Sequence, residues 1–344
     1  MNKECPEGKI LNPLTRRCIK IKTEKLKKPK KNMQRVSMNQ QIIDNLRIIQ
    51  EYEKLNKSQI KVNAYEKVIE NIELYDKEIE GIEDIKKING IGKKIEEKIL
   101  EFITTGKMHT VENILKDEKY ILGKKLLGIY GIGPAKIEEL MKKINIFDDI
   151  YQHQDLLNDK QLIGLKYYDD LQTRIPLVEA KKHYKIIQNT LGKDTIFDMV
   201  GSFRRKAKTI GDIDILIKDK DDGKFKLKEF INNLEAKGYV LETLASGKNK
   251  FMGICKISED LPARRIDILV TEPKHYYFAL LYFTGSYNFN IYMRRIALEK
   301  GLSLSEYGFK NNNTKEFIDT SETIKSEEDI FKYLEIPYVS PEKR

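Results

Sequence analysis

Residues 201–217 hold a group of side chains that could bind metal ions and phosphate. The segment reads GSFRRKAKTIGDIDILI. Strict alternation after Gly211 predicts a strand with Asp212 and Asp214 on one face and isoleucines on the opposite, core-facing side. Two carboxylates on an exposed strand face suit hard cations such as Mg²⁺, which prefer oxygen ligands. The Gly-Ser turn that opens the segment would present backbone N–H groups and a hydroxyl to phosphate oxygens.

A second alternating segment supplies a third carboxylate. Residues 264–270 read RRIDILV, which places Asp267 on the face opposite Ile266 and Ile268. A solvated edge strand would explain a lone D-x-D pair. Three carboxylates on two neighbouring strands, behind a Gly-Ser turn, instead indicate a two-metal site. Two ions about 4 Å apart would activate an attacking oxygen and hold a leaving phosphate.

A motif that occurs twice predicts contacts with the DNA backbone. Residues 88–95 (INGIGKKI) and 129–136 (IYGIGPAK) both have the form of a helix–hairpin–helix. Two glycines allow a tight turn whose backbone N–H groups face a phosphate, and the following helix adds its dipole. Two such turns, each opening an amphipathic helix, indicate gripping of DNA without regard to sequence. The DNA contacts expected here are Gly90, Gly92, Gly131, Gly133 and Lys136.

Apolar spacing predicts the helices that surround these motifs. One helix begins at Ser37, and a second is expected around residues 62–80, with Ile79 on its apolar face. Pro176 is well suited to begin a helix, which we expect over residues 177–191. A further helix over residues 225–237 would lie between the catalytic strands.

The motifs together resemble those of the family X DNA polymerases, of the polymerase beta type. The resemblance is carried by GS followed by D-x-D, then R-R-I-D, and then YFTGS at residues 282–286, and it extends over about residues 40–344. It implies an α+β multidomain fold, in which helical helix–hairpin–helix domains precede a nucleotidyltransferase palm with a small mixed β-sheet and a carboxy-terminal α/β subdomain. The domains expected are a two-cysteine module and basic linker (1–36), a lyase-like helical domain (37–113), a DNA-binding helical subdomain (114–176), the palm (177–273) and a nucleotide-selection subdomain (274–344).

The resemblance also implies roles in nucleotidyl transfer. Asp212 and Asp214 would bridge two Mg²⁺ ions, for which Mn²⁺ could substitute, and Asp267 would hold the catalytic ion. Tyr287 and Leu269 depart from polymerase beta, in which an acidic and a basic residue stand at these positions; both changes bear on nucleotide affinity and closing. The other residues expected to bind the nucleotide are Gly201, Ser202, Arg205, Gly211, Tyr282, Phe283, Gly285 and Asn290, and Arg265 and Arg294 would contact DNA.

A second activity is implied for the amino-terminal helical domain. Lys98 takes the place of the lysine that forms a Schiff base in a 5′-deoxyribose-phosphate lyase, a role that requires a partly neutral amine. Ile60 stands where polymerase beta has a histidine, and Thr110 replaces a further basic residue. An ordinary solvated lysine is the alternative for Lys98. The residues that match the family's phosphate pocket are Lys61, Tyr65 and Lys94.

Positive charge is concentrated at the amino terminus. The 344 residues carry a net charge of +10, and residues 1–36, with 12 basic and 3 acidic side chains, account for nine of these charges. The nearly neutral remainder must therefore bind DNA through local patches. No apolar stretch approaches the roughly 18 residues of a membrane span. Three cysteines (Cys5, Cys18 and Cys255) indicate a reducing compartment without a disulfide framework.

Residues 1–20 resemble a small two-cysteine module found on proteins of large cytoplasmic DNA viruses. A Cys5–Cys18 disulfide, half of a metal site and an unstructured basic leader remain alternatives for this segment. The expected location is intracellular: the host cytoplasm or the virion for a viral protein, and the nucleus for a cellular one. Residues 21–36 form a basic linker with a KKPKK cluster.

The three carboxylates, the two hairpin motifs and the resemblance to family X together favour a DNA polymerase that fills short gaps in base excision repair. Its expected partners are gapped double-stranded DNA with a 5′-phosphate, deoxynucleoside triphosphates and a DNA ligase. We expect a monomer that binds no membrane and holds a monovalent cation at the hairpin turns. A template-independent nucleotidyltransferase and a non-catalytic DNA-binding scaffold are the alternatives.

Overall fold

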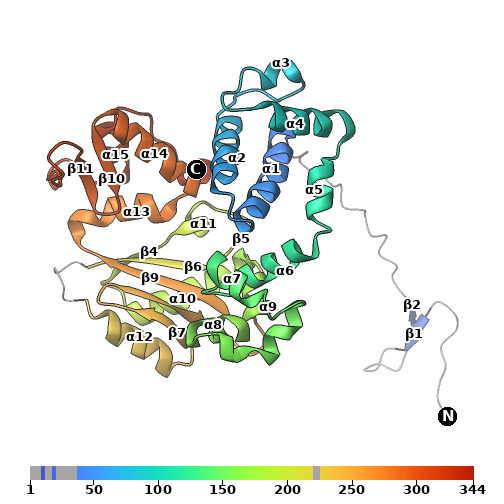
Figure 1. The fold of residues 1–344 in the computed structure, drawn as a ribbon. Helices are drawn as coiled ribbons and strands as arrows, with labels where there is room; N and C mark the ends of the chain where they lie inside the picture. The colour runs from blue at the N-terminus through green and yellow to red at the C-terminus, as the bar shows by residue number, and fades with distance from the viewer. Residues whose placement is uncertain (1–8, 12–17, 21–36, 220–224) are drawn as a thin grey trace, which may run out of the picture.

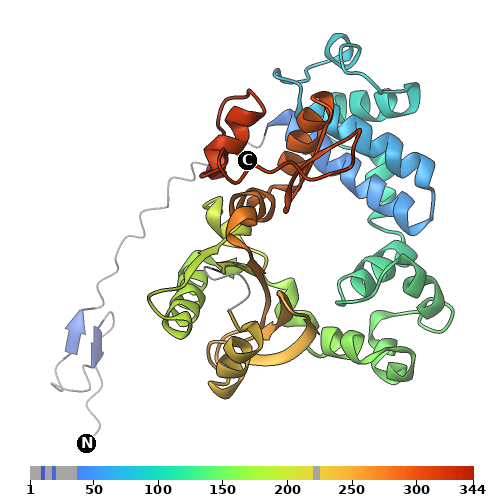
Figure 2. The same ribbon diagram turned by 90° about the vertical axis from the view of Figure 1, so that its left-hand side faces the viewer.

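The computed structural model describes residues 9–11, 18–20, 37–219 and 225–344. From the amino terminus, the described chain forms a helical domain, a second helical unit, a sheet-based domain and a smaller carboxy-terminal domain (Figure 1). Viewed from the side, these four parts follow one another around a ring, so that the first helical domain lies beside the last domain (Figure 2). In the described part of the chain, no helix is both long and apolar enough to cross a membrane.

The first helical domain is built on a pair of long amphipathic helices. Ser37 caps α1, because its side chain accepts a hydrogen bond from the backbone N–H of Gln40 at 3.1 Å. The second helix ends at Glu73, so the prediction of a helix to residue 80 was wrong. Ile79 is nevertheless fully buried, because a loop carries it back to α1, where its N–H donates to Asn39 Oδ1 at 2.8 Å. The helices are α1 Met38–Leu55, α2 Gln59–Glu73, α3 Ile82–Ile85, α4 Lys93–Thr105 and α5 His109–Ile114.

The second helical unit connects this domain to the sheet. It has a core of its own, in which Leu126, Ile129 and Leu140 are almost completely buried. Its elements are α6 Glu118–Leu127, α7 Pro134–Leu140, the 3₁₀ helices η1 Phe147–Gln152 and η2 Gln154–Leu156, α8 Asp159–Lys166 and α9 Tyr168–Gln172. Both hairpin motifs open a helix as predicted, since Gly92 precedes α4 and Gly133 precedes α7.

A five-stranded mixed sheet forms the centre of the molecule, in the order β4-β6-β9-β8-β7. Strands β6 and β9 are parallel, and the other pairs are antiparallel. Alternating isoleucines of β6 and β9 pack into one core with helices α10 and α12. The elements are β3 Ile175–Pro176, α10 Leu177–Leu191, β4 Ile196–Met199, α11 Gly201–Arg204, β5 Thr209–Ile210, β6 Ile213–Lys218, α12 Leu227–Ala236, β7 Val240–Ser246, β8 Lys250–Cys255 and β9 Arg264–Thr271.

The carboxy-terminal domain packs its helices around buried aromatic rings. Phe278 and Phe289 lie in this core together with Phe309 and Phe331. The elements are η3 Pro273–His275, α13 Tyr276–Thr284, α14 Tyr287–Glu299, β10 Leu302–Ser305, β11 Gly308–Asn311, α15 Glu327–Tyr333 and η4 Pro341–Lys343. Helical domains before a mixed sheet confirm the α+β class.

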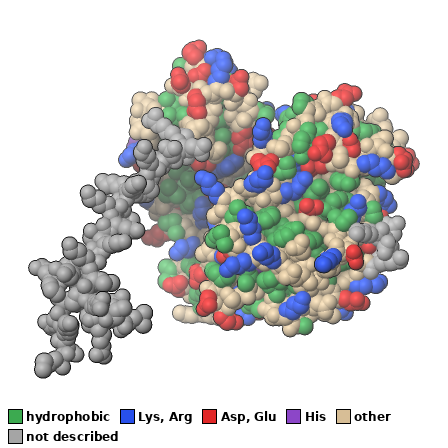
Figure 3. Space-filling model, turned by 180° about the vertical axis from the view of Figure 1, so that it is seen from behind, with side chains coloured by type: hydrophobic (Ala, Val, Ile, Leu, Met, Phe, Trp, Pro, Cys, Tyr) green, Lys and Arg blue, Asp and Glu red, His purple; other side chains and the backbone are tan. Residues whose placement is uncertain are grey.

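The amino-terminal segment contributes two short antiparallel strands, β1 Lys9–Leu11 and β2 Cys18–Lys20. The alternatives for Cys5 and Cys18 concern side chains that lie outside the described residues. The remaining cysteine, Cys255, is buried and free. Lys and Arg side chains are spread over the face seen in Figure 3 and are interspersed with acidic ones, so this face presents charges of both signs.

Candidate active site

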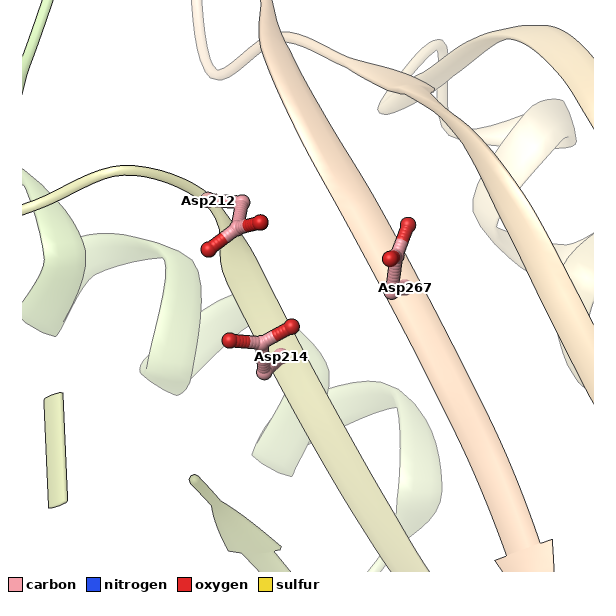
Figure 4. Close-up of side chains that lie close together, drawn as sticks. All are labelled: Asp212, Asp214 and Asp267. Carbon is pink, nitrogen blue, oxygen red and sulfur yellow. The ribbon is translucent and has the colours of Figure 1, made fainter. Parts of the chain in front are cut away.

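The parallel register of β6 and β9 brings the three predicted carboxylates together. Asp214 lies directly opposite Asp267 in the pairing of the two strands, and Asp212 immediately precedes β6. One oxygen from each residue lies within 4.8 Å of the others. All three side chains project from the same side of the two strands (Figure 4). The sequence placed two carboxylates on one strand face, and the register adds the third.

Electrostatic repulsion in this cluster favours binding of a cation. Burial, together with the charges of Asp212 and Asp267, raises the pKa of the Asp214 carboxyl to about 8. Burial also raises the pKa of Asp267. Asp267 Oδ1 is buried and has no hydrogen-bond partner among the described residues. Three hard oxygen donors, one of them without a hydrogen bond, fit a divalent ion well.

Arg265 is the cation nearest to these carboxylates. Its guanidinium donates to Asp212, and its Nε lies 3.8 Å from Asp267 Oδ1. The sequence assigned Arg265 to DNA contact and did not anticipate this contact with the cluster. The arginine therefore offsets part of the charge that bound ions would otherwise neutralise.

The Gly-Ser segment approaches the same carboxylates from β4. Instead of the simple turn that the sequence predicted, Gly201 begins the one-turn helix α11. Gly201 has φ of 57°, and a Cβ atom there would collide with Asp214 Oδ2. Only glycine therefore allows the backbone to come this close to Asp214. Ser202 follows directly, while Gly211 stands one residue before Asp212.

Arg205 connects the Gly-Ser segment to the YFTGS motif. Its Nη1 donates to the carbonyl of Thr284 at 2.5 Å, and a Cβ atom on Gly285 would lie 3.3 Å from the same nitrogen. Burial lowers the pKa of this half-buried guanidinium. Arg205 thus lies at the junction between the sheet domain and the carboxy-terminal domain.

The remaining residues expected to bind the nucleotide or the template gather around Tyr282. Asn290 Nδ2 donates to the Tyr282 carbonyl at 2.8 Å. The guanidinium carbon of Arg294 lies 5.2 Å from the centre of the Tyr282 ring, and Phe283 packs edge-on against that ring at 5.0 Å. Asn290 and Arg294 lie four residues apart and so share one face of α14.

The second hairpin opens toward the carboxylates. A cavity of about 420 Å³ is lined by residues 128–132 of the turn and by Gly211, Asp212 and Arg265. Gly131 has φ of 83°, and Lys136 forms an ion pair with Glu139 at 2.9 Å. One end of a DNA strand held at this turn would therefore lie next to Asp212.

The first hairpin and the expected lyase residues belong to the separate amino-terminal core. Lys98 Nζ donates to the carbonyl of Lys94, one turn earlier on α4, at 3.1 Å. Lys61 on α2 forms an ion pair with Glu53 at 3.0 Å, and the nearby Tyr65 is almost completely buried. In the part of the chain that the structure describes, no hydrogen bond or ion pair joins Lys61 or Tyr65 on α2 to Lys94 or Lys98 on α4.

One buried polar group near the site was missed at the level of sequence. Arg264 is only 3% exposed and forms an ion pair with Glu179 of α10. The sequence did hold an indication of this contact, because alternation along the strand places Arg264 on the same face as the core-facing Ile266 and Ile268. A charged side chain at a core position requires a buried partner.

Models of four protein families match successive parts of the chain. They describe a helix–hairpin–helix domain (residues 37–108), the fingers domain of DNA polymerase lambda (124–172), the DNA polymerase beta palm (174–273) and the DNA polymerase beta thumb (279–344). The palm match includes all three aspartates. The chain belongs to the family X DNA polymerases. The expected family, and the order of helical domains, palm and thumb, are therefore confirmed.

Relatives of this family X chain match most of its length. It is 30% identical to DNA polymerase lambda of Arabidopsis thaliana over 303 residues, which cover 82% of this chain and 57% of that protein. DNA polymerase lambda of Rattus norvegicus is 28% identical over 82% of this chain and 52% of its own length. DNA polymerase/3′-5′ exonuclease PolX of Bacillus subtilis is 28% identical over 83% of this chain and 50% of its own. The chain thus spans between half and three fifths of these relatives.

Proposed function

We propose that the protein is a DNA-directed DNA polymerase that fills short gaps during base excision repair. The observation that carries the proposal is the shared cavity, which joins the second hairpin to Asp212 of a three-carboxylate cluster. Polymerases require this combination, since they must hold a primer end while metal ligands act on its terminal oxygen. The relatives named as DNA polymerases support the same reading.

The proposed reaction is nucleotidyl transfer by in-line displacement. The primer 3′-oxygen forms a bond to the α-phosphorus of a deoxynucleoside triphosphate, the bond to pyrophosphate breaks, and the hydroxyl proton leaves to solvent. Two Mg²⁺ ions, which Mn²⁺ could replace, would supply charge neutralisation and a more acidic primer hydroxyl when bound. Asp212 and Asp214 would hold both ions, and Asp267 would hold the one nearest the primer.

Protein groups around the cluster would position the nucleotide. Ser202 and the N–H groups of α11 would bind the β- and γ-phosphates with Arg205. Arg205 would bind these phosphates from the palm–thumb junction, where it also donates to the Thr284 carbonyl. Tyr282 would exclude a 2′-hydroxyl, and Asn290 would reach the minor-groove edge of the incoming nucleotide. Catalysis then consists of orientation and charge stabilisation.

We also propose a 5′-deoxyribose-phosphate lyase centred on Lys98. Its amine would attack the C1′ aldehyde, lose water to form an imine, and release the 5′-phosphorylated strand by β-elimination. Lys94, one turn away on α4, and Lys61 on α2 would bind the phosphate. The same domain would hold the downstream 5′-phosphate of a gap, and a DNA ligase would then seal the product.

The decisive experiment is incorporation of nucleotides on three substrates. A labelled primer is supplied alone, on an open template, or on a template with a one-nucleotide gap and a downstream 5′-phosphate, with Mg²⁺ or with EDTA. We expect Mg²⁺-dependent addition of the complementary nucleotide, fastest on the gap. Equal addition to the single strand would favour a template-independent transferase, and no addition on any substrate would favour a DNA-binding scaffold.

A further inference from the structure

A buried ion pair holds the beginning of the strand that carries Asp267. Arg264 is the first residue of β9, and both of its fork nitrogens engage Glu179: Nε donates to Oε1 at 2.6 Å and Nη2 to Oε2 at 3.0 Å. The third nitrogen, Nη1, donates to the carbonyl and to the hydroxyl of Thr173 at 2.9 and 2.8 Å. Glu179 is 7% exposed. Every nitrogen of this guanidinium is therefore fixed in one direction.

This arrangement adds little to folding stability by itself. Removing two charges from water costs about as much as their attraction returns, so a buried ion pair often contributes no more than apolar side chains of similar volume. The ion pair instead fixes the orientation of both side chains, because a bidentate arginine–carboxylate pair tolerates little rotation or sliding. Its effect must therefore be sought in what Arg264 holds in place.

The residues next to Arg264 on the strand belong to the active site. Side chains alternate along β9, so Arg264 faces the core while Arg265 and Asp267 face the carboxylate cluster. Asp267 pairs with Asp214 only through the parallel register of β9 on β6. A small shift of the amino-terminal end of β9 would therefore change the spacing of the carboxylates and the contact of Arg265 with Asp212.

The side chains that hold this strand end come from the connection between fingers and palm and from the two helices that it joins. Asp170 on α9 accepts a hydrogen bond from the N–H of Ala263 at 2.8 Å, one residue before β9. Thr173 lies in the connection itself, and Glu179 lies in the first turn of α10. The segment 170–179 thus fastens the fingers, with their DNA-facing hairpin, to the catalytic strand.

The charge of Glu179 is directed at Arg264 rather than at its other neighbour. His183 Nε2 lies 3.7 Å from Glu179 Oε1, but burial lowers the pKa of His183 to about 4, so the ring is neutral near pH 7. His183 Nδ1 is instead 2.6 Å from the Tyr239 hydroxyl. Arg264 is accordingly the cation that pairs with Glu179.

We propose that Glu179 is a positioning residue for nucleotidyl transfer, which acts through Arg264 to hold Arg265 and Asp267 in register with Asp212 and Asp214. The proposal rests on the polymerase function proposed above. It predicts a defect in metal binding and turnover, because the carboxylates would no longer converge. It predicts little change in the binding of DNA, because most of the expected DNA contacts lie on the hairpins and Arg265 is the one contact that would move.

The test compares Glu179→Gln and Arg264→Lys with the wild-type chain. Binding of Mn²⁺ to the DNA-free protein is followed by electron paramagnetic resonance, which needs no turnover. We expect the affinity for Mn²⁺ and the kcat each to fall about tenfold, as for other residues that orient metal ligands. At saturating metal, the KM for the nucleotide and the Kd for gapped DNA should stay within about twofold, because Ser202, Arg205 and the two hairpins are not altered.

Two further variants separate positioning from general stability. Ile187→Ala removes a fully buried side chain from the same helix, α10, and should lower the Tm without changing the affinity for Mn²⁺. Thr173→Ala removes one of the two acceptors of Arg264 Nη1 but spares the ion pair, and should give a smaller loss of Mn²⁺ affinity than Glu179→Gln. It also keeps the test open if the ion-pair variants do not fold.

The possible outcomes distinguish this inference from the function on which it rests. Normal Mn²⁺ affinity in folded Glu179→Gln and Arg264→Lys would overturn the positioning role, as would an equal loss in Ile187→Ala. If only Thr173→Ala folds, wild-type Mn²⁺ affinity in that variant would overturn it. A wild-type chain that binds Mn²⁺ but incorporates no nucleotide would refute the proposed polymerase, while the resonance data would still decide the role of Glu179.

Discussion

The two hairpin turns have nearly the same sequence pattern and backbone, but they are attached to the molecule differently. Gly90 and Gly131 have φ of 86° and 83°, and neither following helix has a side-chain cap. The turn at Gly131 is held within its own unit by Gln161, which donates to its carbonyl at 2.8 Å. It is also fastened to the palm, because Tyr130 packs against a small cluster of buried palm residues. The turn at Gly90 is fastened within its own domain, where Asn71 donates to the carbonyl of Asn89 at 2.7 Å.

This difference indicates two ways of using one motif. A close-packed core transmits position rigidly, so the second turn keeps a fixed spacing from Asp212. The first domain meets the second helical unit through the buried ring of Tyr120 and through exposed ion pairs, such as Lys57–Glu138. It meets the carboxy-terminal domain through a contact between Glu73 and Asn288. Exposed pairs of this kind contribute about 0–1 kcal/mol each. We infer that the second turn sets the register of the primer end, while the first adapts to the width of the gap.

The largest effect should come from a change that spares both turns. Asp267→Ala removes a proposed metal ligand, so we expect incorporation to fall by about 10³-fold or more while DNA affinity changes by no more than a few-fold. Single-turnover incorporation and a filter-binding titration measure the two quantities. Asp260→Ala, in the exposed loop before β9, is the matched control and should behave as wild type. Near-normal turnover in Asp267→Ala would contradict the assignment of nucleotidyl transfer to the carboxylate cluster beside the second turn.

A chemical role for the first hairpin's helix would sharpen the contrast further. Borohydride should trap the wild-type chain on DNA with a 5′-deoxyribose phosphate, and Lys98→Ala should reduce trapping by about 10²-fold, since it removes the proposed nucleophile. Lys93→Ala, an exposed lysine of the same helix, serves as the control and should trap normally. Undiminished trapping by Lys98→Ala would mean that the first hairpin only binds.

Glycine substitutions test the two turns directly against each other. At positive φ, alanine strains the turn by about 1–2 kcal/mol. Gly131→Ala also brings a Cβ atom within 3.3 Å of Gln161. We expect Gly131→Ala to lower incorporation about tenfold on open templates and on gaps alike, because it moves the primer end relative to the metal ligands.

Gly90→Ala should instead lower incorporation about fivefold, and only on gaps with a downstream 5′-phosphate. On such a gap, DNA already bound at the second hairpin brings the 5′-phosphate to the first hairpin in an intramolecular step, which this variant would weaken. The comparison uses kcat/KM on one-nucleotide gaps with and without the phosphate. If the two variants lose activity equally on all substrates, the turns do not divide the work as inferred.

The smallest effect concerns charge held in the palm. Because the pKa of Asp214 is about 8 when folded, against 3.8 as its ordinary value, the folded state holds a proton that the unfolded chain has lost between these values. Without divalent ions, stability should therefore fall as the pH rises from about 4 to about 8. Asp214→Asn should raise the Tm in EDTA by several °C at pH 8, roughly 2 kcal/mol, and by less at pH 5. Thermal melts of the variant and the wild-type chain at both pH values test this prediction. A difference in Tm that does not change with pH would argue against the raised pKa of Asp214.

Much of the site could be predicted because it depends on local pattern. Alternation fixed the faces of Asp212, Asp214 and Asp267, and glycine spacing identified both turns. The helix expected over residues 177–191 is α10 in the structure. Local signals failed where chain direction changes: Ile79 has helical spacing but lies in a loop, and the Gly-Ser turn is the start of α11. The family roles of the remaining site residues, the domain boundaries and a viral source stay predictions.

The sequence by itself determined the residue types, their faces and the family, because periodicity and glycine placement act over a few residues. Only the tertiary structure decided how these residues meet. The parallel register of β6 on β9 places Asp214 against Asp267 across 53 positions of sequence. Folding also brings Arg264 onto Glu179, and the Gly131 turn to the cavity of Asp212. Such partners are chosen by packing and by satisfaction of buried polar groups over the whole chain, which no short pattern encodes.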